Sequence, residues 1–436
     1  MRSHLLPLGL AVLFINPVIA QTLNPSLSVR PAVAAPASGA SLTLDEALSR
    51  AIDTNPALRA AAREVSAVDA TILQARTRPN PELQGQVEDL RNATRITTVQ
   101  INQPIELGGK RGARIAAAEK NRSAASLALD VQRAEIRADV VTAFADVLAA
   151  QEGVRLAQAT ADLAQRASNV AARRVLAGRV SPVEETRARV AEANVRLEAA
   201  VAVNELAASR KRLAGLWGAA SPDFAQVQGN LESLPPLPAL TDLNQQLETS
   251  PALLRARLEI ERRNALTRVE RSLRTPDVTV SLGARRNNEL GLNQAIVGAS
   301  LPLPLFNRNQ GNVLEAERRT DKARDELAVA TVQASNSLAQ AHARLDVARQ
   351  SVTTLREQIL PGAQSAYDAA TRGFELGKFN FLEVLDAQRT LFQARAQYQR
   401  ALAEAYRAAA EIERVLGGAV GSQSPVDTRI STSPKP

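Results

Sequence analysis

The sequence contains one series of segments twice, and this internal repeat limits the folds open to the chain. Asn55-Pro56-Ala57-Leu58 recurs as Ser250-Pro251-Ala252-Leu253, 195 residues later (251−56). Further matches are Pro104 with Pro302 and Gly178 with Gly377, displaced by 198 and 199 residues. A nearly constant displacement predicts two copies of one unit with matched elements. Solenoids stack at least three short repeats, so two long copies indicate a protomer with internal two-fold pseudosymmetry.

The first twenty residues predict an export signal. A charged start at residues 1–4 precedes an apolar run from Leu5 to Ile15 and the small-residue cleavage site Val18-Ile19-Ala20. The apolar run is too short to span a bilayer, so cleavage fits better than a membrane anchor. No later segment supplies the ~20 continuous apolar residues of a membrane helix, so entry into a membrane would require a β-barrel.

Composition narrows the classes of protein. The chain has no Cys, which excludes disulfides and a lipid attached to an N-terminal Cys. The net charge of +8 raises the question of nucleic-acid binding. However, basic and acidic residues alternate along the predicted helices, and only 3% of residues are aromatic, so stacking platforms are scarce. We expect no nucleic-acid partner.

Each copy opens with a short helix and a medium one. In copy one, Thr43 and Glu46 form a capping box that starts a helix, and Pro56 begins the next. Copy two repeats this order from Thr241 and from Pro251.

Two extended segments follow in each copy. Apolar and small polar residues alternate over residues 278–284, and 83–87 is a weaker counterpart. This period of two predicts a strand with one apolar and one polar face. The returning segments are 96–105 and 295–303, each about as long as a tilted barrel strand. Four strands cannot close a barrel and unpaired edges are not tolerated in lipid, so other copies of the chain must complete it.

A very long helix comes next in each copy. Residues 113–177 contain no Pro and a single Gly, and at 1.5 Å per residue they would extend roughly 100 Å. Its counterpart, 312–372, is interrupted by Pro361-Gly362, where we expect a kink. Both helices end at a glycine, Gly178 or Gly377, suited to a left-handed C-cap.

The returning helices of about 35 residues start at once. Capping boxes at Ser181 to Glu184 and Asn380 to Glu383 open them, and they run to Leu216 and Leu416. The apolar spacing of the second predicts the seam of an antiparallel coiled coil.

This layout resembles the TolC-like outer-membrane efflux proteins over residues 42–417. Phe374 to Ala387 looks like the second tip turn of that family. Gln103 to Arg111 resembles the strand-to-helix junction of the subfamily serving cobalt–zinc–cadmium type cation efflux. The strands depart from the family in having no Trp or Tyr of an aromatic girdle.

The resemblance implies a mixed α+β fold, predominantly α. Four strands per protomer would give a homotrimer a twelve-stranded β-barrel in outer-membrane lipid, continued by a periplasmic α-helical barrel. Its partners would be a periplasmic adaptor and a proton-driven inner-membrane pump of the RND type. The expected organisation is: signal peptide 1–20; linker 21–41; first repeat 42–218, with strand pair 82–105 and helical hairpin 109–216; linker 219–239; second repeat 240–417, with strand pair 277–304 and hairpin 309–416; and a disordered tail 418–436.

Few residues could carry chemistry. His342 is the only His after the signal peptide, no Cys is present, and Met occurs only at the start. A hydrolase would need a nucleophile with a base, and a zinc or copper site needs nitrogen or sulfur ligands. We therefore predict no enzyme, no cofactor and no resident metal: if the system exports such ions, this chain is a conduit.

Carboxylates near the tips are the sharpest candidates for a site. Glu383 and Asp386 share a helical face, and Glu184 is the counterpart of Glu383 (383−184 = 199). The resemblance implies that Glu383 and Asp386 narrow the periplasmic entrance, where three copies of each would concentrate cations. Helix capping is the competing role, favoured for Glu184. The turns are the expected adaptor contacts: Gly178, Arg179, Val180, Gly377, Lys378 and Phe379.

Two other functions remain open. Within the family, the duct could serve drugs or secreted polypeptides. From another class, the chain could be a periplasmic coiled-coil adaptor or scaffold, which would need no strand pairs.

Overall fold

A computed structural model describes residues 41–230, 232–376, 378–379 and 381–418. The expected signal peptide (1–20) and nearly all of the expected linker 21–41 and tail 418–436 lie outside these residues. A search of the described helices for a stretch long and apolar enough to cross a membrane finds none.

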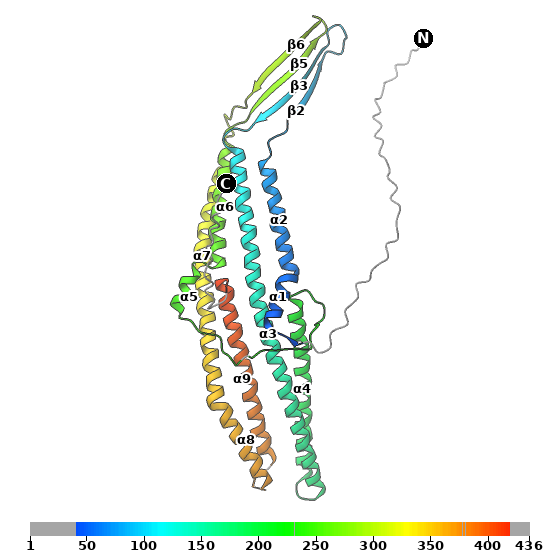
Figure 1. Ribbon diagram of the computed structural model, residues 1–436, viewed down its shortest axis with the longest axis vertical. Helices are drawn as coiled ribbons and strands as arrows, with labels where there is room; N and C mark the ends of the chain where they lie inside the picture. Colours follow the sequence, from blue (N-terminus) through cyan, green and yellow to red (C-terminus); the bar gives the residue numbers. More distant parts are fainter. Residues whose placement is uncertain (1–40, 231, 377, 380, 419–436) are drawn as a thin grey trace, which may run out of the picture. The chain divides into compact units, whose positions relative to one another are not determined.

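The helices follow the order of the two repeats (Figure 1). The first repeat contains α1 Leu44–Thr54, α2 Pro56–Arg76, α3 Lys110–Leu176 and α4 Pro182–Gly215. The second contains α5 Leu240–Leu247, α6 Pro251–Ser272, α7 Gln310–Thr354, α8 Leu360–Glu375 and α9 Phe381–Leu416. The fold is therefore mostly helical. The 67 residues of α3 give this helix a length of roughly 100 Å.

The predicted helix starts are right in part. The capping box of α1 is confirmed: Glu46 N–H donates to Thr43, and Thr43 N–H donates to the Glu46 carboxylate. However, α5 begins at Leu240 after Ala239, and no side chain caps it. At α4, the Ser181 hydroxyl accepts from Val183 N–H at 3.3 Å and the Ser181 carbonyl accepts from Glu184 N–H at 2.9 Å, but among the described residues no bond joins the Glu184 carboxylate to the Ser181 N–H. The capping box predicted there is wrong.

A short π-helix, Leu355–Ile359, lies between α7 and α8. The Leu360 N–H donates to the Leu355 carbonyl, five residues back. Pro361, which has no N–H to donate, follows one residue later. The predicted interruption of the second long helix is therefore present, as a π-bulge at the turn before Pro361.

Four strands form one antiparallel sheet in the order β2-β3-β5-β6 (Figure 1). They are β2 Glu82–Glu88, β3 Ile96–Ile105, β5 Val278–Asn287 and β6 Leu292–Ser300. The central pairing, β3 with β5, joins the two repeats. Two short strands, β1 Ser41–Leu42 and β4 Gln226–Val227, pair in parallel elsewhere.

The two faces of the four-stranded sheet differ in polarity. One row across the sheet is Leu83, Ile101, Leu282 and Val297, each at least half exposed. The adjacent row, on the opposite face, is Gln84, Gln100, Gly283 and Ile296. The alternation predicted for single strands thus extends across the sheet, giving one apolar, exposed face.

Each repeat closes its own core in the same way. The first core contains Val140 and Leu213, and the second contains Leu338 and Ile412, all buried. Gly218, with φ +80°, packs against Pro56 at the start of α2, and Gly417, with φ +81°, packs against Pro251 at the start of α6.

The structure revises one repeat match. Gly109 before α3 and Asn309 before α7 both have left-handed backbones, with φ +71° and +58°. Their displacement of 200 pairs Pro104 with Pro304. The predicted match of Pro104 with Pro302 is wrong by two residues because two prolines lie close together there.

Candidate functional site

The first tip turn is a Schellman motif. Gly178 has φ +65°, its N–H donates to the Val175 carbonyl, and Arg179 N–H donates to the Arg174 carbonyl. This left-handed backbone is why glycine is needed, since nothing lies within 4 Å of a Cβ built there. Arg179 is exposed and Val180 is half-buried. The predicted left-handed C-cap is confirmed at Gly178.

The second tip turn repeats the hydrogen bond of Arg179, with Lys378 in its place, and adds one from Phe379. Lys378 N–H donates to the Gly373 carbonyl at 2.8 Å, and Phe379 N–H donates to the same oxygen at 3.2 Å. The Phe379 ring covers Gly373 so closely that a Cβ there would collide with it, yet 45% of Phe379 stays exposed. Lys378 is exposed. Gly377 lies outside the described residues.

The two tips are joined by a contact that sequence reasoning missed. The Arg174 guanidinium of α3 lies over the Phe374 ring of α8, 4.0 Å from its centroid. A cation over an aromatic face is attracted by the ring quadrupole. The repeat shows that both residues sit near helix ends, but it gives no signal that those two ends meet.

The acidic candidates lie on an exposed helix face. Glu383 and Asp386 are both exposed in the single chain. Further along α9, Thr390, Gln393 and Gln397 continue the same exposed face at three- and four-residue spacing. Glu184, in the first turn of α4, is half-buried. The structure of one chain therefore brings Glu383 and Asp386 together, with Glu184 in the matched turn of the other hairpin.

The polar face of the sheet carries an amide cluster. Gln84 accepts hydrogen bonds from Gln100 at 2.9 Å and from Asn102 at 3.0 Å. On the same face, the Arg285 guanidinium donates to Glu88 at 3.2 Å. These polar side chains bond to one another, so the cluster fits a water-facing surface of the sheet better than a ligand-binding site.

An ion pair fastens the sheet to the helices. The nearly buried Lys110 ammonium is 2.7 Å from Asp277, which also accepts from Leu107 N–H at 3.1 Å. Arg114 forms a two-pronged pair with Glu106 beside it. The residues from Gln103 to Arg111, singled out from the sequence, therefore link the β3–α3 junction to the α6–β5 junction.

His342 has a structural partner. Its Nε2 is 3.0 Å from the carbonyl oxygen of Pro238, in the segment that links the repeats. Nowhere in the part of the chain that the structure describes do three His, Cys, Asp or Glu side chains gather closely enough to hold a metal ion.

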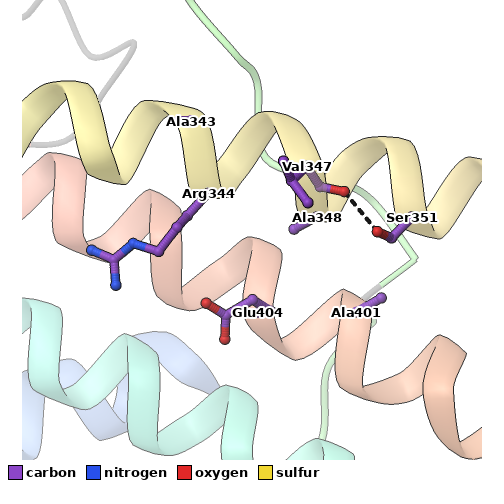
Figure 2. Close-up of a pocket in the computed structure, with 7 residues that line it drawn as sticks. All are labelled: Ala343, Arg344, Val347, Ala348, Ser351, Ala401 and Glu404. Atoms are coloured by element: carbon purple, nitrogen blue, oxygen red, sulfur yellow. Dashed lines mark hydrogen bonds between the residues drawn. The ribbon is translucent and has the colours of Figure 1, made fainter.

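Two grooves between helices offer no reactive arrangement. The first, of about 340 Å³, lies between α7 and α9; three of its seven lining residues are alanine, and Arg344 and Glu404 are its charged side chains (Figure 2). Its Ser351 hydroxyl donates to the Val347 carbonyl. A second groove, of about 590 Å³, lies between α3, α6 and α7 and includes Glu259. Hydrogen bonds from Arg262 hold the pKa of Glu259 below its usual value.

Comparison with protein families adds a match to both repeats. The family described as outer membrane efflux protein matches residues 47–219 and 243–418. These two ranges, 173 and 176 residues long (219−46; 418−242), cover most of the chain and contain most residues of the two cores.

Individual proteins are similar over most of their lengths. The chain is 50% identical to the cobalt-zinc-cadmium resistance protein CzcC of Cupriavidus metallidurans, over 96% of this chain and 100% of that one. A crystal structure of a membrane protein from Pseudomonas aeruginosa has the same fold, with TM-score 0.74, 21% identity, and coverage of 86% and 93%. Crystal structures of CusC match with TM-score 0.72, 21% identity, and coverage of 86% and 92%.

Proposed function

The chain belongs to the outer membrane efflux protein family, and we propose that it is the export duct of a tripartite RND-type system for heavy-metal cations such as cobalt, zinc, cadmium or nickel. Family membership makes it a transport protein of the outer membrane and not an enzyme. The single observation that carries the choice of substrate is the 50% identity, along nearly the whole chain, to a protein named for cobalt, zinc and cadmium resistance.

The duct requires three copies. Four strands leave β2 and β6 as free edges, and their exposed apolar face suits contact with lipid. In a homotrimer, twelve strands would enclose a barrel in outer-membrane lipid, and the long helices would continue it into the periplasm. The sequence has no Cys, so it offers no cysteine to which a lipid could be attached.

Deleting the gene and restoring it tests the substrate. Sensitivity to cobalt, zinc or cadmium that the intact gene reverses supports the proposal. Sensitivity to drugs alone, or loss of a secreted polypeptide, would assign the duct to the other branch of the family. The adaptor or scaffold alternative is disfavoured by the paired strands and by the family match.

The tips would dock a periplasmic adaptor that links the duct to a proton-driven inner-membrane pump. The candidates are Gly178, Arg179, Val180, Gly377, Lys378 and Phe379. Gly178 has open space around it, so Gly178→Leu strains the turn but creates no clash in the single chain. Assembled trimers that no longer cross-link to the adaptor are the expected result, and unchanged cross-linking would refute docking at this turn.

The acidic face of α9 would form the entrance constriction. A divalent cation about 6 Å from one carboxylate gains roughly 1.4 kcal/mol in water, about a tenfold local enrichment before screening by salt. Three copies each of Glu383 and Asp386 would therefore concentrate cations at the mouth, and Glu184 would add to this charge from the first turn of α4.

Planar-bilayer recordings of Asp386→Asn test this role. We expect changed conductance and weaker block by multivalent cations. Asp325→Asn is the matched control, since Asp325 is an exposed carboxylate on α7, far along the chain from either tip turn. Equal effects of the two substitutions would contradict a constriction at Asp386.

A further inference from the structure

The pairing between the two repeats inside one chain specifies the pairing between chains. In the sheet, the returning strand of copy one, β3, pairs with the first strand of copy two, β5. Among the described strands of one chain, neither the returning strand of copy two, β6, nor the first strand of copy one, β2, has a second neighbour. If three chains close one ring, β6 of one chain must pair with β2 of the next chain. This pairing between chains would be equivalent to the β3–β5 pairing within a chain.

Two independent observations fix how the strands correspond. The β2-to-β5 displacement is 195, from the matched helix starts at Pro56 and Pro251. The β3-to-β6 displacement is 200, from the left-handed residues Gly109 and Asn309 before the long helices.

The hairpin registers give the same answer. The residue numbers of two directly opposite residues always sum to 184 in the β2–β3 pair (83+101) and to 579 in the β5–β6 pair (282+297). The difference of 395 equals 195+200. A displacement of 198 for β6 would give 393 and does not fit.

The register between chains follows by transfer. Within one chain, Ile101 lies opposite Leu282. Adding 200 to 101 gives Leu301, and subtracting 195 from 282 gives Val87. Leu301 is therefore expected opposite Val87 of the next chain. Likewise, Gln103 opposite Val280 becomes Leu303 opposite Gly85. Resting on the proposed trimer, we infer that residues 300–303 extend β6 by pairing with residues 85–88 of the neighbouring copy in this register.

The unpaired segment has the properties this requires. Leu301 is 49% exposed, Leu303 71% and Val87 53%, and the register places all three on the apolar face of the sheet. Pro302 offers no N–H, but the β3–β5 ladder already contains a proline, Pro104 opposite Thr279. The paired segment ends at Leu303 because the Leu305 N–H donates to the Leu303 carbonyl at 2.9 Å.

Disulfide cross-linking in isolated outer membranes tests the register, and the absence of native Cys removes background. A chain carrying Leu301→Cys and Val87→Cys is expected to form covalent dimers and trimers on oxidation. Directly opposite Cβ atoms lie about 4.5–5.5 Å apart, near the disulfide range. The positive control is Ile101→Cys with Leu282→Cys, the equivalent pair within one chain, scored by loss of free thiols.

The register control is Leu301→Cys with Leu83→Cys, displaced by four residues or roughly 13 Å along the strand. It should stay uncross-linked, while metal resistance under reducing conditions shows that each variant assembles. Preferential cross-linking of the Leu83 pair overturns the register, as does no cross-linking of the Val87 pair in native trimers that confer resistance. Absence of any trimer would instead overturn the proposed duct itself.

Discussion

The contact between Arg174 and Phe374 should hold the two tip hairpins of each protomer together. At 4.0 Å from the ring centroid and half-buried, it contributes about 1 kcal/mol, between the values for exposed and desolvated cation–π pairs. The next ion pair between α3 and the second repeat along the described helices, Arg407 with Asp146, lies 28 residues up α3 (174−146), roughly 40 Å away. Between Asp146 and this contact, none of the ion pairs described for α3 joins it to the second repeat.

Removing it should favour the open entrance. If three tips open together, losing about 1 kcal/mol in each changes the ratio of open to closed channels by on the order of a hundredfold. Single-channel recordings of Arg174→Gln and of Phe374→Leu should both show a larger open fraction. The double variant should resemble either single one, because each already removes the shared contact.

A neighbouring arginine separates this effect from loss of charge. Arg173 is exposed and only bonds weakly to a backbone carbonyl, so Arg173→Gln removes the same charge without touching the ring. We expect it to leave the open fraction nearly unchanged. Equal effects of the two arginine substitutions, or additive effects of Arg174→Gln and Phe374→Leu, would refute the contact as a restraint on opening.

Three further substitutions test the folded state. Gly108→Ala should destabilise the protein by about 2 kcal/mol or more, because Gly108 has φ +68° and a Cβ would lie 2.6 Å from that of Thr275. Gly112→Ala, inside α3 with open space, should stabilise it by up to about 1 kcal/mol, so their dissociation temperatures in detergent should move in opposite directions. Glu259→Gln removes a carboxylate whose pKa Arg262 lowers from 4.5, so the stability it contributes above that pH disappears as the pH falls through the lowered value. The variant should be less stable than the parent at pH 7 by about 0.5–1 kcal/mol, the difference should shrink as the pH falls below the usual carboxylate range, and a pH-independent difference would contradict this.

Features set by the local backbone could be predicted from the sequence. The turn at Gly178 needs only a left-handed residue between two helical patterns, and the structure has it. The two faces of the strands follow from a period of two, which Leu83 and Val87 already displayed. Such signals depend on residues close together in the chain, so one sequence contains them.

Features set by contacts between distant segments could not be predicted. Periodicity identifies which face of a helix is apolar, but not which helix end it meets, so Arg174 over Phe374 carried no signal. One local detail was also missed: an N-cap hydroxyl can accept from either of two N–H groups, and Ser181 accepts from Val183 instead of Glu184. The match of Pro104 to Pro304 needed the backbone conformation at Asn309, because Pro302 fits the sequence equally well.

A duct for transition-metal cations must release every ion it admits. Nitrogen and sulfur ligands would hold such ions, and the one His of the described chain is engaged with the Pro238 carbonyl. The constriction proposed at Glu383 and Asp386 would attract cations by charge, which scarcely distinguishes zinc from cadmium. Asp386→Asn should therefore lower resistance to zinc and to cadmium by the same factor, because on this proposal the discrimination between the two ions takes place before they reach the tip. Dose–response curves for zinc and cadmium in cells with the same pump measure this, and a substitution that changed the ratio of the two resistances would show that the duct itself selects.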